Sequence, residues 1–567
     1  MSLEERAALW ARGWRGPLVA AFVAVLAGLP GLLAMPTIDR DEARFAQASA
    51  QMMESGDFVS IRFQDQPRNK KPVGIHWLQV LSVALFSHVE DREIWAYRIP
   101  SLLGAALAAA ACAWGAAAFA NRGVAMLAGA ALGAAFMLST EAFFAKTDAV
   151  LCGSVTLAMA ALARIYLAHK GPTAGARARF RAGLTVRMMF WVGLTASVLV
   201  KGPVGPMVVG LALLSLAAWD RDARWMKGLG WGWGMIFMAA MVGPWAMAIT
   251  VATDGAFWSD AVAGDLGAKL AGGQESHGAP PGYHALLAPL LLFPATLLLP
   301  AALSTAWRGR AEPAVRFALC WLLPSWLVFE LVPTKLWHYT LPLLPALVWL
   351  MAMALAQPIG RVSRYVGGGL TLAAGLALAA VGPLAVVVLP APGALVWAVV
   401  TALLFMAVAV AGTILLLRQA AGRALALSGG LAVAAHGVMF GALAPALTPL
   451  WLSQQAAGAL TRAGLTPREG MTAGPVATAG YDEPSLVFAL GASTELGDAQ
   501  AAADAIADGR PVIVEERQMK AFSAALAANG DGAAPVGVLP GLDYSNGRHD
   551  ILHLFKPLPA APAKDGK

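Results

Sequence analysis

Long apolar runs are the feature that most constrains what this chain can fold into. Runs of about 20 apolar residues, the length that a helix needs to cross the hydrocarbon core of a membrane, begin near residues 17, 95, 123, 148, 188, 203, 229, 286, 317, 341, 365, 394 and 424. Of the 567 residues 58% are hydrophobic and 13% are charged, against about 25% charged in soluble domains. We therefore predict an all-α polytopic membrane protein with about 13 transmembrane helices, which excludes a soluble, disordered or collagen-like chain.

Two apolar segments affect the predicted topology. The first run, Gly16 to Met35, continues without a convincing cleavage site, so we expect a signal anchor that forms the first span. The segment from His76 to Ser87 is apolar but only 12 residues long, which favours a re-entrant or interfacial helix over a span. The three cysteines lie within apolar runs without disulfide or metal-ligand spacing, and we interpret them as core residues: Cys112, Cys152 and Cys320.

The placement of charge predicts the orientation. With the N-terminus in the cytoplasm, the cytoplasmic loops hold 20 basic and 5 acidic residues, whereas the opposite loops before residue 448 hold 12 basic and 16 acidic residues. This bias is the one that the positive-inside rule requires. The net charge of +7 is thereby explained as a membrane-orientation signal, and we expect no nucleic-acid partner.

The chain divides into two predicted domains, a transmembrane domain over 1–447 and a tail over 448–567. An odd number of spans places the tail outside the cytoplasm. Short β-prone runs there alternate with Ala-rich helical stretches, which predicts a small α/β domain. The β-prone runs are Val476–Thr478, Leu486–Ala489, Val512–Val514 and Ile551–Phe555, and the helical ones are Asp498–Ala507 and Met519–Ala528.

Acidic residues mark the outer face of the predicted bundle. In the first outer loop, 37–75, a helix-like stretch that runs to Met53 begins around Asp41 and Glu42. Asp41 could cap this helix, and Glu42 could interact favourably with the positive N-terminal end of its dipole. Capping does not exclude a catalytic role for these acids. Asp148 begins the fourth span on the same face, and ionisable residues next to hydrocarbon are candidates for function.

Cationic and hydrogen-bonding residues gather on the same face. They are Lys71, Lys201, Lys335, His338 and Tyr339. Taken singly, such residues are more often interface anchors that snorkel toward lipid headgroups. Together with the carboxylates they suit a phosphate-bearing lipid and acid/base chemistry.

The outer loop 252–285 contains the Gly-rich stretch Gly272 to Gly282, which could form a lid over a substrate or a passive linker. His277 and Glu275 in this stretch are too few for a zinc site. We assign no cofactor from the sequence. A divalent cation stays an open alternative that the ligand spacing does not support.

Six short motifs resemble those of the lipid A 4-amino-4-deoxy-L-arabinose transferase (ArnT-like) family. More broadly, the chain is similar to the GT-C superfamily of polyprenyl-phosphate-sugar-dependent glycosyltransferases, over roughly residues 15 to 450. The motifs are Asp41-Glu42-Ala43-Arg44-Phe45-Ala46, Lys70-Lys71-Pro72, Tyr97-Arg98-Ile99-Pro100-Ser101, Thr147-Asp148-Ala149, Lys201-Gly202-Pro203 and His338-Tyr339-Thr340-Leu341-Pro342.

The resemblance implies a multi-pass enzyme of the bacterial inner membrane that works at the periplasmic face. It would move a sugar, such as an aminoarabinose-like pentose, a uronic acid or a hexose, from a polyprenyl phosphate donor to a lipid acceptor such as lipid A or lipopolysaccharide. We expect an inverting reaction and a monomer among membrane lipids. One departure concerns metal binding: relatives often have an acid where this chain has Lys70.

The resemblance also assigns roles to residues. Catalysis would involve Asp41, Glu42 and Asp148, and the donor phosphate or substrate would be bound by Arg44, Lys71, Lys201, Lys335, His338 and Tyr339. The alternative is a GT-C enzyme with another acceptor, such as a protein O-mannosyltransferase. A transporter of lipid-linked sugar is the alternative from a different class, which the gathering of carboxylates on one face disfavours.

Overall fold

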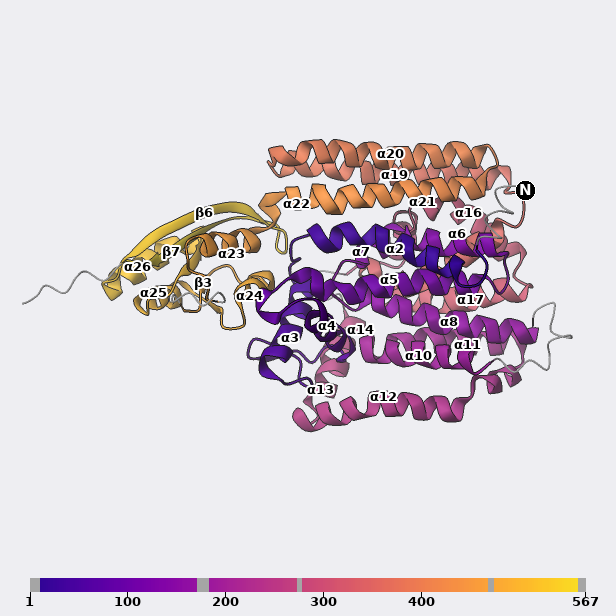
Figure 1. Cartoon of the computed structure of the whole chain (residues 1–567), viewed down its shortest axis with the longest axis horizontal. Coiled ribbons are helices and arrows are strands. Elements are labelled where there is room, and N and C mark those ends of the chain that lie inside the picture. The colour runs from indigo at the N-terminus through magenta and orange to yellow at the C-terminus, as the bar shows by residue number, and fades with distance from the viewer. Residues whose placement is uncertain (1–10, 171–182, 273–277, 468–473, 559–567) are drawn as a thin grey trace, which may run out of the picture.

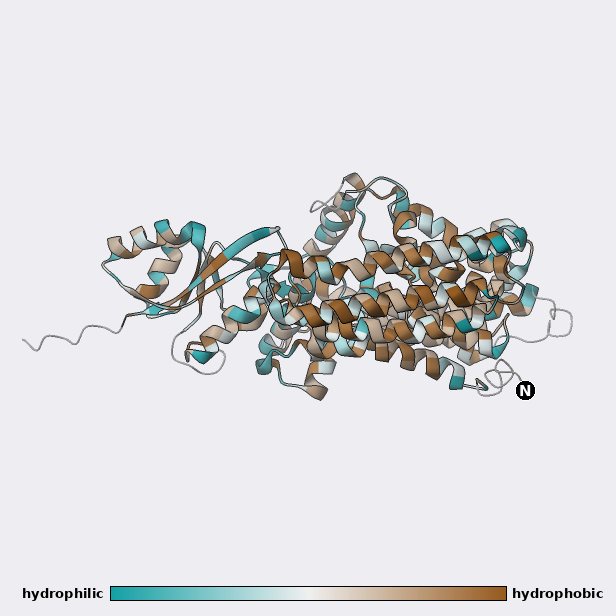
Figure 2. Cartoon of the chain, turned by 90° about the horizontal axis from the view of Figure 1, so that it is seen from above, coloured by the Kyte–Doolittle hydropathy of each residue, from teal (hydrophilic) through white to brown (hydrophobic). Residues whose placement is uncertain are grey.

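The computed structural model describes residues 11–170, 183–272, 278–467 and 474–558. Helices aligned along the long axis form a bundle, and a small sheet domain made by the tail projects from one end (Figure 1). Hydrophobic residues run along the bundle, and hydrophilic ones gather at its two ends and over the tail (Figure 2). This distribution is the one expected of a membrane-embedded bundle.

Ten helical segments in the described part of the chain are long and apolar enough to cross a membrane. They are α2 (Arg15–Ala34), α5 (Ile94–Ala116), α8 (Asp148–Lys170), α10 (Leu184–Lys201), α12 (Trp231–Ala252), α17 (Pro313–Leu331), α18 with the 3₁₀ turn before it (Trp337–Ala354), α19 (Arg361–Val388), α20 with its preceding turn (Pro392–Leu417) and α21 with its extension to α22 (Ala421–Ala446).

The remaining three predicted spans coincide with helices of a different kind. The pair α15 (Tyr283–Leu291) and Ala295–Arg308, which contains α16 (Leu299–Arg308), is bent by 115°. Two further helices are shorter apolar ones, α6 (Arg122–Gly133) and α11 (Val204–Asp220). By length, the described residues therefore contain ten spans, or eleven with the bent pair, and the count of thirteen stays a prediction.

Small residues let the first spans approach each other closely. Ala20 and Ala24 of α2 form a buried cluster with Ala109 and Ala113 of α5. Gly129 of α6 meets both helices, and a Cβ there would lie 2.5 Å from the Ala109 carbonyl oxygen. Without a hydrophobic driving force inside the bilayer, such close backbone packing holds helices together.

Short elements cover the end of the bundle next to the tail. The first loop forms α3 (Asp41–Ser55), a two-stranded hairpin of β1 (Arg62–Phe63) and β2 (Gln66–Pro67), and α4 (Gly74–Phe86). The 13-residue α4 agrees with the expectation of a helix too short to span. After α12 the chain forms α13 (Ala256–Ser259), the π-helix η3 (Asp260–Gly267) and α14 (Ala268–Ala271), which lie at the same end (Figure 1).

The tail folds into a five-stranded sheet with helices on both faces. The strand order is β4-β3-β5-β7-β6, with β3 parallel to β4 and β5, and β7 antiparallel to β5 and β6. The strands are β3 (Ala477–Ala479), β4 (Glu495–Gly497), β5 (Val512–Glu515), β6 (Ala533–Asp543) and β7 (Arg548–Pro557). The helices are α23 (Leu452–Arg462), α24 (Pro484–Leu490), α25 (Ala499–Ala507) and α26 (Met519–Asn529).

One predicted strand of the tail is wrong. The run Leu486–Ala489 lies in α24, which starts with Pro484 in its first turn and is buried along most of its length. Phe488 packs edge-on against Tyr97 at 5.3 Å between ring centroids. A four-residue apolar run shows no periodicity that separates a buried strand from a buried helix. Packing against the first loop and α5 accounts for the helix here.

Candidate active site

A polar cavity of about 840 Å³ opens at the end of the bundle that faces the tail domain. Its walls come from the first loop and α3, the start of α8, the end of α10, the η3–α14 segment and the loop before α18. Eight basic and six acidic residues line it, so the lining carries a small positive excess. Eight of the nine candidate residues lie in this lining: Asp41, Glu42, Arg44, Lys71, Asp148, Lys201, His338 and Tyr339.

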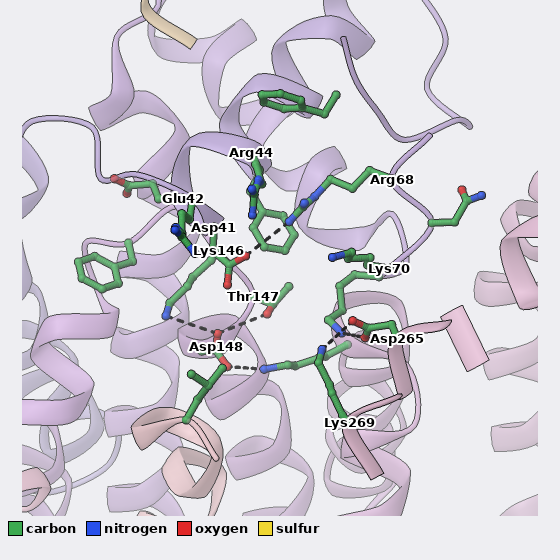
Figure 3. Close-up of a pocket in the computed structure, with 18 of the residues that line it drawn as sticks. Asp41, Glu42, Arg44, Arg68, Lys70, Lys146, Thr147, Asp148, Asp265 and Lys269 are labelled. Atoms are coloured by element: carbon green, nitrogen blue, oxygen red, sulfur yellow. Dashed lines mark hydrogen bonds and ion pairs between the residues drawn. The ribbon is translucent and has the colours of Figure 1, made fainter. Parts of the chain in front are cut away.

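Asp41 is the first residue of α3. Arg40, at the N-cap position, has φ 63°, and Asp41 makes no capping hydrogen bond to the helix. The interpretation of Asp41 as a cap is therefore wrong, since it lies one residue too late. Its side chain is 60% exposed within the cavity, and Oδ1 lies 3.6 Å from the Arg68 guanidinium (Figure 3).

The charge on Asp41 is held by its neighbours. Burial by itself raises the pKa of this carboxyl, but the cations of Arg68 and Lys146 together outweigh burial and lower the pKa below its ordinary value. Asp41 is consequently ionised at neutral pH. A carboxylate with a depressed pKa is well suited to stabilise positive charge or orient a ligand, and less well suited to remove a proton.

The Glu42 side chain lies at the wall of the cavity but is buried among protein groups. Its carboxylate accepts hydrogen bonds from Arg98 at 2.9 and 2.7 Å and from the Ala145 amide at 2.8 Å. The Ile38 amide also donates to it at 2.9 Å. Glu42 and Arg98 are both buried, so the structure places Glu42 as the link between α3, α5 and the segment before α8.

Asp148 begins α8, as predicted, and sits within a buried group of charges. Its carboxylate accepts a hydrogen bond from Lys201 Nζ at 2.5 Å and lies 3.9 Å from Lys146 Nζ (Figure 3). His338 Nε2 lies 3.7 Å away on the same oxygen as Lys146. This arrangement keeps the carboxylate fixed, because a buried charge is tolerated only when paired.

Lys146 lies between two buried acids, Glu141 and Asp148. Its ammonium lies 3.0 Å from Glu141 Oε1 and 3.9 Å from Asp148, and its charge acts on Asp41. Glu141 is fully buried and lies 3.8 Å from His338 Nδ1. A continuous chain of opposite charges therefore runs from Glu141 through Lys146 to Asp148 and Lys201.

On the opposite wall, Lys71 pairs with the segment after α12. Lys71 Nζ donates to Asp265 Oδ2 at 2.6 Å, and Lys269 donates to the other oxygen at 2.7 Å. Asn69 likewise donates to Asp260 at 3.0 Å. The predicted lid loop thus contacts the cavity through its acids, whereas its residues 273–277, including Glu275 and His277, lie outside the described residues.

The other residues that were predicted to bind the donor or substrate differ in whether they line the cavity. The Lys201 ammonium lies 5.6 Å from the centroid of the Tyr339 ring, a cation–π distance, and Arg44 lines the cavity from α3. Lys335 is not part of the lining. It is buried, and its ammonium donates to the Val332 carbonyl at 2.6 Å, which suits a residue that closes the end of α17.

Several residues of the site escaped the sequence reasoning. They are Arg68, Glu141, Lys146, Asp265 and Lys269. Lys146 stands two residues before Asp148 and could have been found as a neighbour of a candidate. Glu141 and Lys269 have partners close in sequence, Lys146 and Asp265. Lys71 and Asp265 are 194 residues apart, so no local spacing signals that pair.

Within the described residues, no group of three or more His, Cys, Asp or Glu side chains could hold a metal ion. The three cysteines are free and buried, in agreement with their interpretation as core residues. What the cavity offers is an arrangement of fixed carboxylates facing cations. Such a site can bind a phosphate and hold charge that develops on it.

Comparison with known proteins gives relatives and a fold. No family model matches the chain. It is 31% identical over 356 residues to an undecaprenyl phosphate-alpha-4-amino-4-deoxy-L-arabinose arabinosyl transferase of Pseudomonas paraeruginosa, an alignment that covers 62% of each chain. The like-named protein of Shewanella sediminis is 27% identical over 322 residues, 56% of this chain and 55% of that one. The matched part thus spans about three fifths of these relatives.

The fold comparison covers more of the molecule. The crystal structure of ArnT from Cupriavidus metallidurans bound to undecaprenyl phosphate has a TM-score of 0.73 to this chain, at 20% identity, over 95% of this chain and 97% of that one. The similarity therefore includes the tail domain. The sequence alignments and this shared architecture agree with the resemblance seen in the six motifs: the chain is similar in sequence to these arabinosyl transferases over about three fifths of its length and has the fold of ArnT.

Proposed function

We propose that the protein is a glycosyltransferase that moves a sugar from a polyprenyl phosphate to a lipid acceptor such as lipid A, in the cavity at the tail-facing end of the bundle. The single observation that carries this is the cavity itself, where Asp41 and Asp148 face Lys71 and Lys201. The names of the relatives, which refer to undecaprenyl phosphate and to 4-amino-4-deoxy-L-arabinose, support a polyprenyl donor that carries an aminopentose.

The reaction follows from the placement of charges. An acceptor oxygen attacks the anomeric carbon, the bond between that carbon and the phosphate oxygen breaks, and the electron pair leaves with the polyprenyl phosphate. Lys71, Lys201 and Tyr339 line the cavity and would hold the negative charge that grows on the leaving group. The configuration at the anomeric carbon is inverted in this single displacement.

The role of Asp41 depends on the acceptor. A phosphate acceptor is already a nucleophile and needs no base, so an ionised Asp41 would orient it or stabilise positive charge on the sugar ring. A hydroxyl acceptor must lose a proton, and Asp41 would receive it. The lowered pKa of Asp41 supports the first role, because a base works best when its pKa lies near the working pH.

Orientation is the second part of the proposal. The cavity would open to the periplasm, with the tail domain and the first loop on that side and the protein acting as a monomer. The excess of basic residues in the loops at the opposite end supports this orientation. The acceptors would then be lipids in the periplasmic leaflet of the inner membrane.

A panel assay tests the function. The purified full-length protein is incubated with polyprenyl phosphates carrying an aminopentose, a uronic acid or a hexose, together with lipid A, other bacterial lipids and an acceptor peptide, and products are identified by mass spectrometry. Transfer of the aminopentose to lipid A is expected. Transfer to the peptide alone would indicate the protein O-mannosyltransferase alternative, and exchange of lipid-linked sugar across vesicles without any product would indicate a transporter.

A further inference from the structure

The backbone just before Asp41 is held by the tail domain, hundreds of residues away in sequence. The Asp39 amide donates to Tyr544 Oη at 2.8 Å, and the Arg40 guanidinium donates to the Ser545 carbonyl at 2.8 Å. The Asp39 carboxylate in turn accepts from the Ser485 amide at 3.0 Å. Both residues that precede Asp41 are therefore anchored on the tail.

The segment needs such anchoring. Arg40 has φ 63° and ψ −102°, a strained region for a residue with a Cβ, which persists only where the surrounding structure imposes it. Asp41 has little to fix it by itself, because its side chain is 60% exposed within the cavity and its ion pair with Arg68 is 3.6 Å long. The position of the Asp41 carboxylate is thus set by the backbone that leads into α3.

The tail residues that provide the anchor are themselves preorganised. Tyr544 and Ser545 lie in the turn between β6 and β7, and Asp543 closes this turn by accepting from the Ser545 amide at 3.0 Å and from the Asn546 side chain at 2.7 Å. The Tyr544 ring packs edge-on against Trp451, with centroids 6.0 Å apart. The turn therefore presents the Tyr544 hydroxyl in one place.

We propose that Tyr544 is a positioning residue for the reaction: the β6–β7 turn holds the Asp39–Arg40 backbone and thereby fixes the Asp41 carboxylate against the substrate. The inference rests on the proposed function, since it gives the tail domain a part in catalysis through Asp41. Tyr544 itself is absent from the cavity lining. Its loss should therefore alter the rate of the chemical step and leave donor binding by the lysines intact.

Tyr544→Phe is the variant that isolates this effect, because it keeps the ring against Trp451 and removes the hydroxyl. We expect kcat to fall by about tenfold with the KM for the donor within about twofold of the wild-type value, since a small misplacement of a catalytic group is costly. The control is Thr461→Val, which removes a hydroxyl of the same domain whose partner is Thr466. The control should keep its kcat.

A second variant guards against a folding defect. Asn546→Ala loosens the turn through its bond to Asp543 and leaves Tyr544 in place, so a smaller loss of kcat is expected. In the Asp41→Asn background, Tyr544→Phe should cause no further loss, because two residues that act as one unit are not additive. Losses that multiply would overturn the proposal, as would a Tyr544→Phe enzyme that matches Thr461→Val.

Hydrogen exchange separates this inference from the function on which it rests. Amides of residues 38–42 should exchange faster in Tyr544→Phe than in the wild type or the control, whatever the substrate. A wild type that forms no product with any donor and acceptor would refute the function. Unchanged protection of these amides in Tyr544→Phe would refute the positioning role, even in a fully active protein.

Discussion

Single side chains in the cavity differ in what they can do, and their surroundings explain the difference. Asp41 faces the cavity and stays ionised, whereas its neighbour Glu42 is enclosed by Arg98 and by backbone amides. Two adjacent acids of one motif thus have different surroundings. The sequence predicted both as catalytic residues, and it could not distinguish them, because a motif carries no information on which way each side chain points.

Replacing Asp41 by Asn tests the residue nearest to the proposed chemistry. The substitution keeps the size of the side chain and removes its charge, so we expect transfer to slow by about 100- to 10,000-fold. Folding should be unaffected, since the side chain is exposed within the cavity. Product formation and the melting temperature of the purified variant measure both points, and near-normal turnover would contradict the role of Asp41.

The pH dependence of donor binding tests Lys71. Burial, together with the nearby ammonium groups of Lys269 and Lys201, lowers the pKa of Lys71 to about 8, although Asp265 acts in the opposite sense. A lysine is charged below its pKa, so affinity for a polyprenyl phosphate should be steady below pH 7 and fall as the pH rises through 8. Titration of undecaprenyl phosphate between pH 6.5 and 9.5 measures this.

Lys71→Arg is the control for that profile. Arginine remains charged throughout this range, so its affinity should stay nearly constant between pH 7 and 9. A variant whose affinity declines in parallel with the wild type would show that another group titrates, and would remove Lys71 from the phosphate site.

At the scale of elements, the short helices at the end of the bundle position the site. The sequence predicted a helix-like stretch to Met53 in the first loop and a short apolar helix after it, and α3 and α4 agree, although Asp41 is not the cap of α3. The strand β6 was missed because Pro535, Gly537, Pro540 and Gly541 lie in it, and such residues weaken a strand pattern. Pairing with β7 along ten residues supplies what local propensity does not.

The ion pair between Glu42 and Arg98 connects α3 and α5, and Glu42 also binds the segment before α8. Loss of this pair should lower the stability of the folded protein. Arg98 also donates to the carbonyls of Met35 and Pro36 at 2.6 and 2.8 Å, which ties the end of α2 to α3. Glu42→Gln leaves a buried guanidinium without its counter-charge, at a cost of about 3 kcal/mol or more. We expect a melting temperature lower by several degrees in detergent.

Asp508→Asn provides the comparison with an exposed pair. The Asp508 carboxylate lies 3.3 Å from Arg510 and its side chain is 67% exposed, and Arg510 keeps its pair with Glu495 at 2.7 Å. Exposed pairs contribute at most about 1 kcal/mol. The melting temperature of this variant should stay close to that of the wild type. Equal losses in the two variants would contradict the structural role given to Glu42.

At the scale of the whole molecule, hydropathy and charge were the most informative signals. The apolar runs and the fold class could be predicted because each span carries its own signal of about 20 residues. The contacts between the tail and the first loop could not, because Asp39 and Tyr544 are separated by 505 positions. No pattern in the sequence around either residue indicates this contact.

Thiol labelling tests the orientation of the whole bundle. The three native cysteines are buried, so single cysteines can be introduced without removing them. In cells with a permeabilised outer membrane, an impermeant maleimide should label Glu90→Cys and should reach Gln419→Cys only after lysis, because the basic loops are expected to stay in the cytoplasm. Labelling of both, or of Gln419→Cys alone, would reject this orientation.

The turn between β6 and β7 also bears on how the protein is made. Asp39 and Arg40 contact residues that are synthesised 505 positions later. A ribosome releases this hairpin after the spans described above, so a polypeptide that stalls before it would reach the bilayer with the segment that leads into α3 unsupported. Such stalled molecules should transfer sugar more slowly than the full chain.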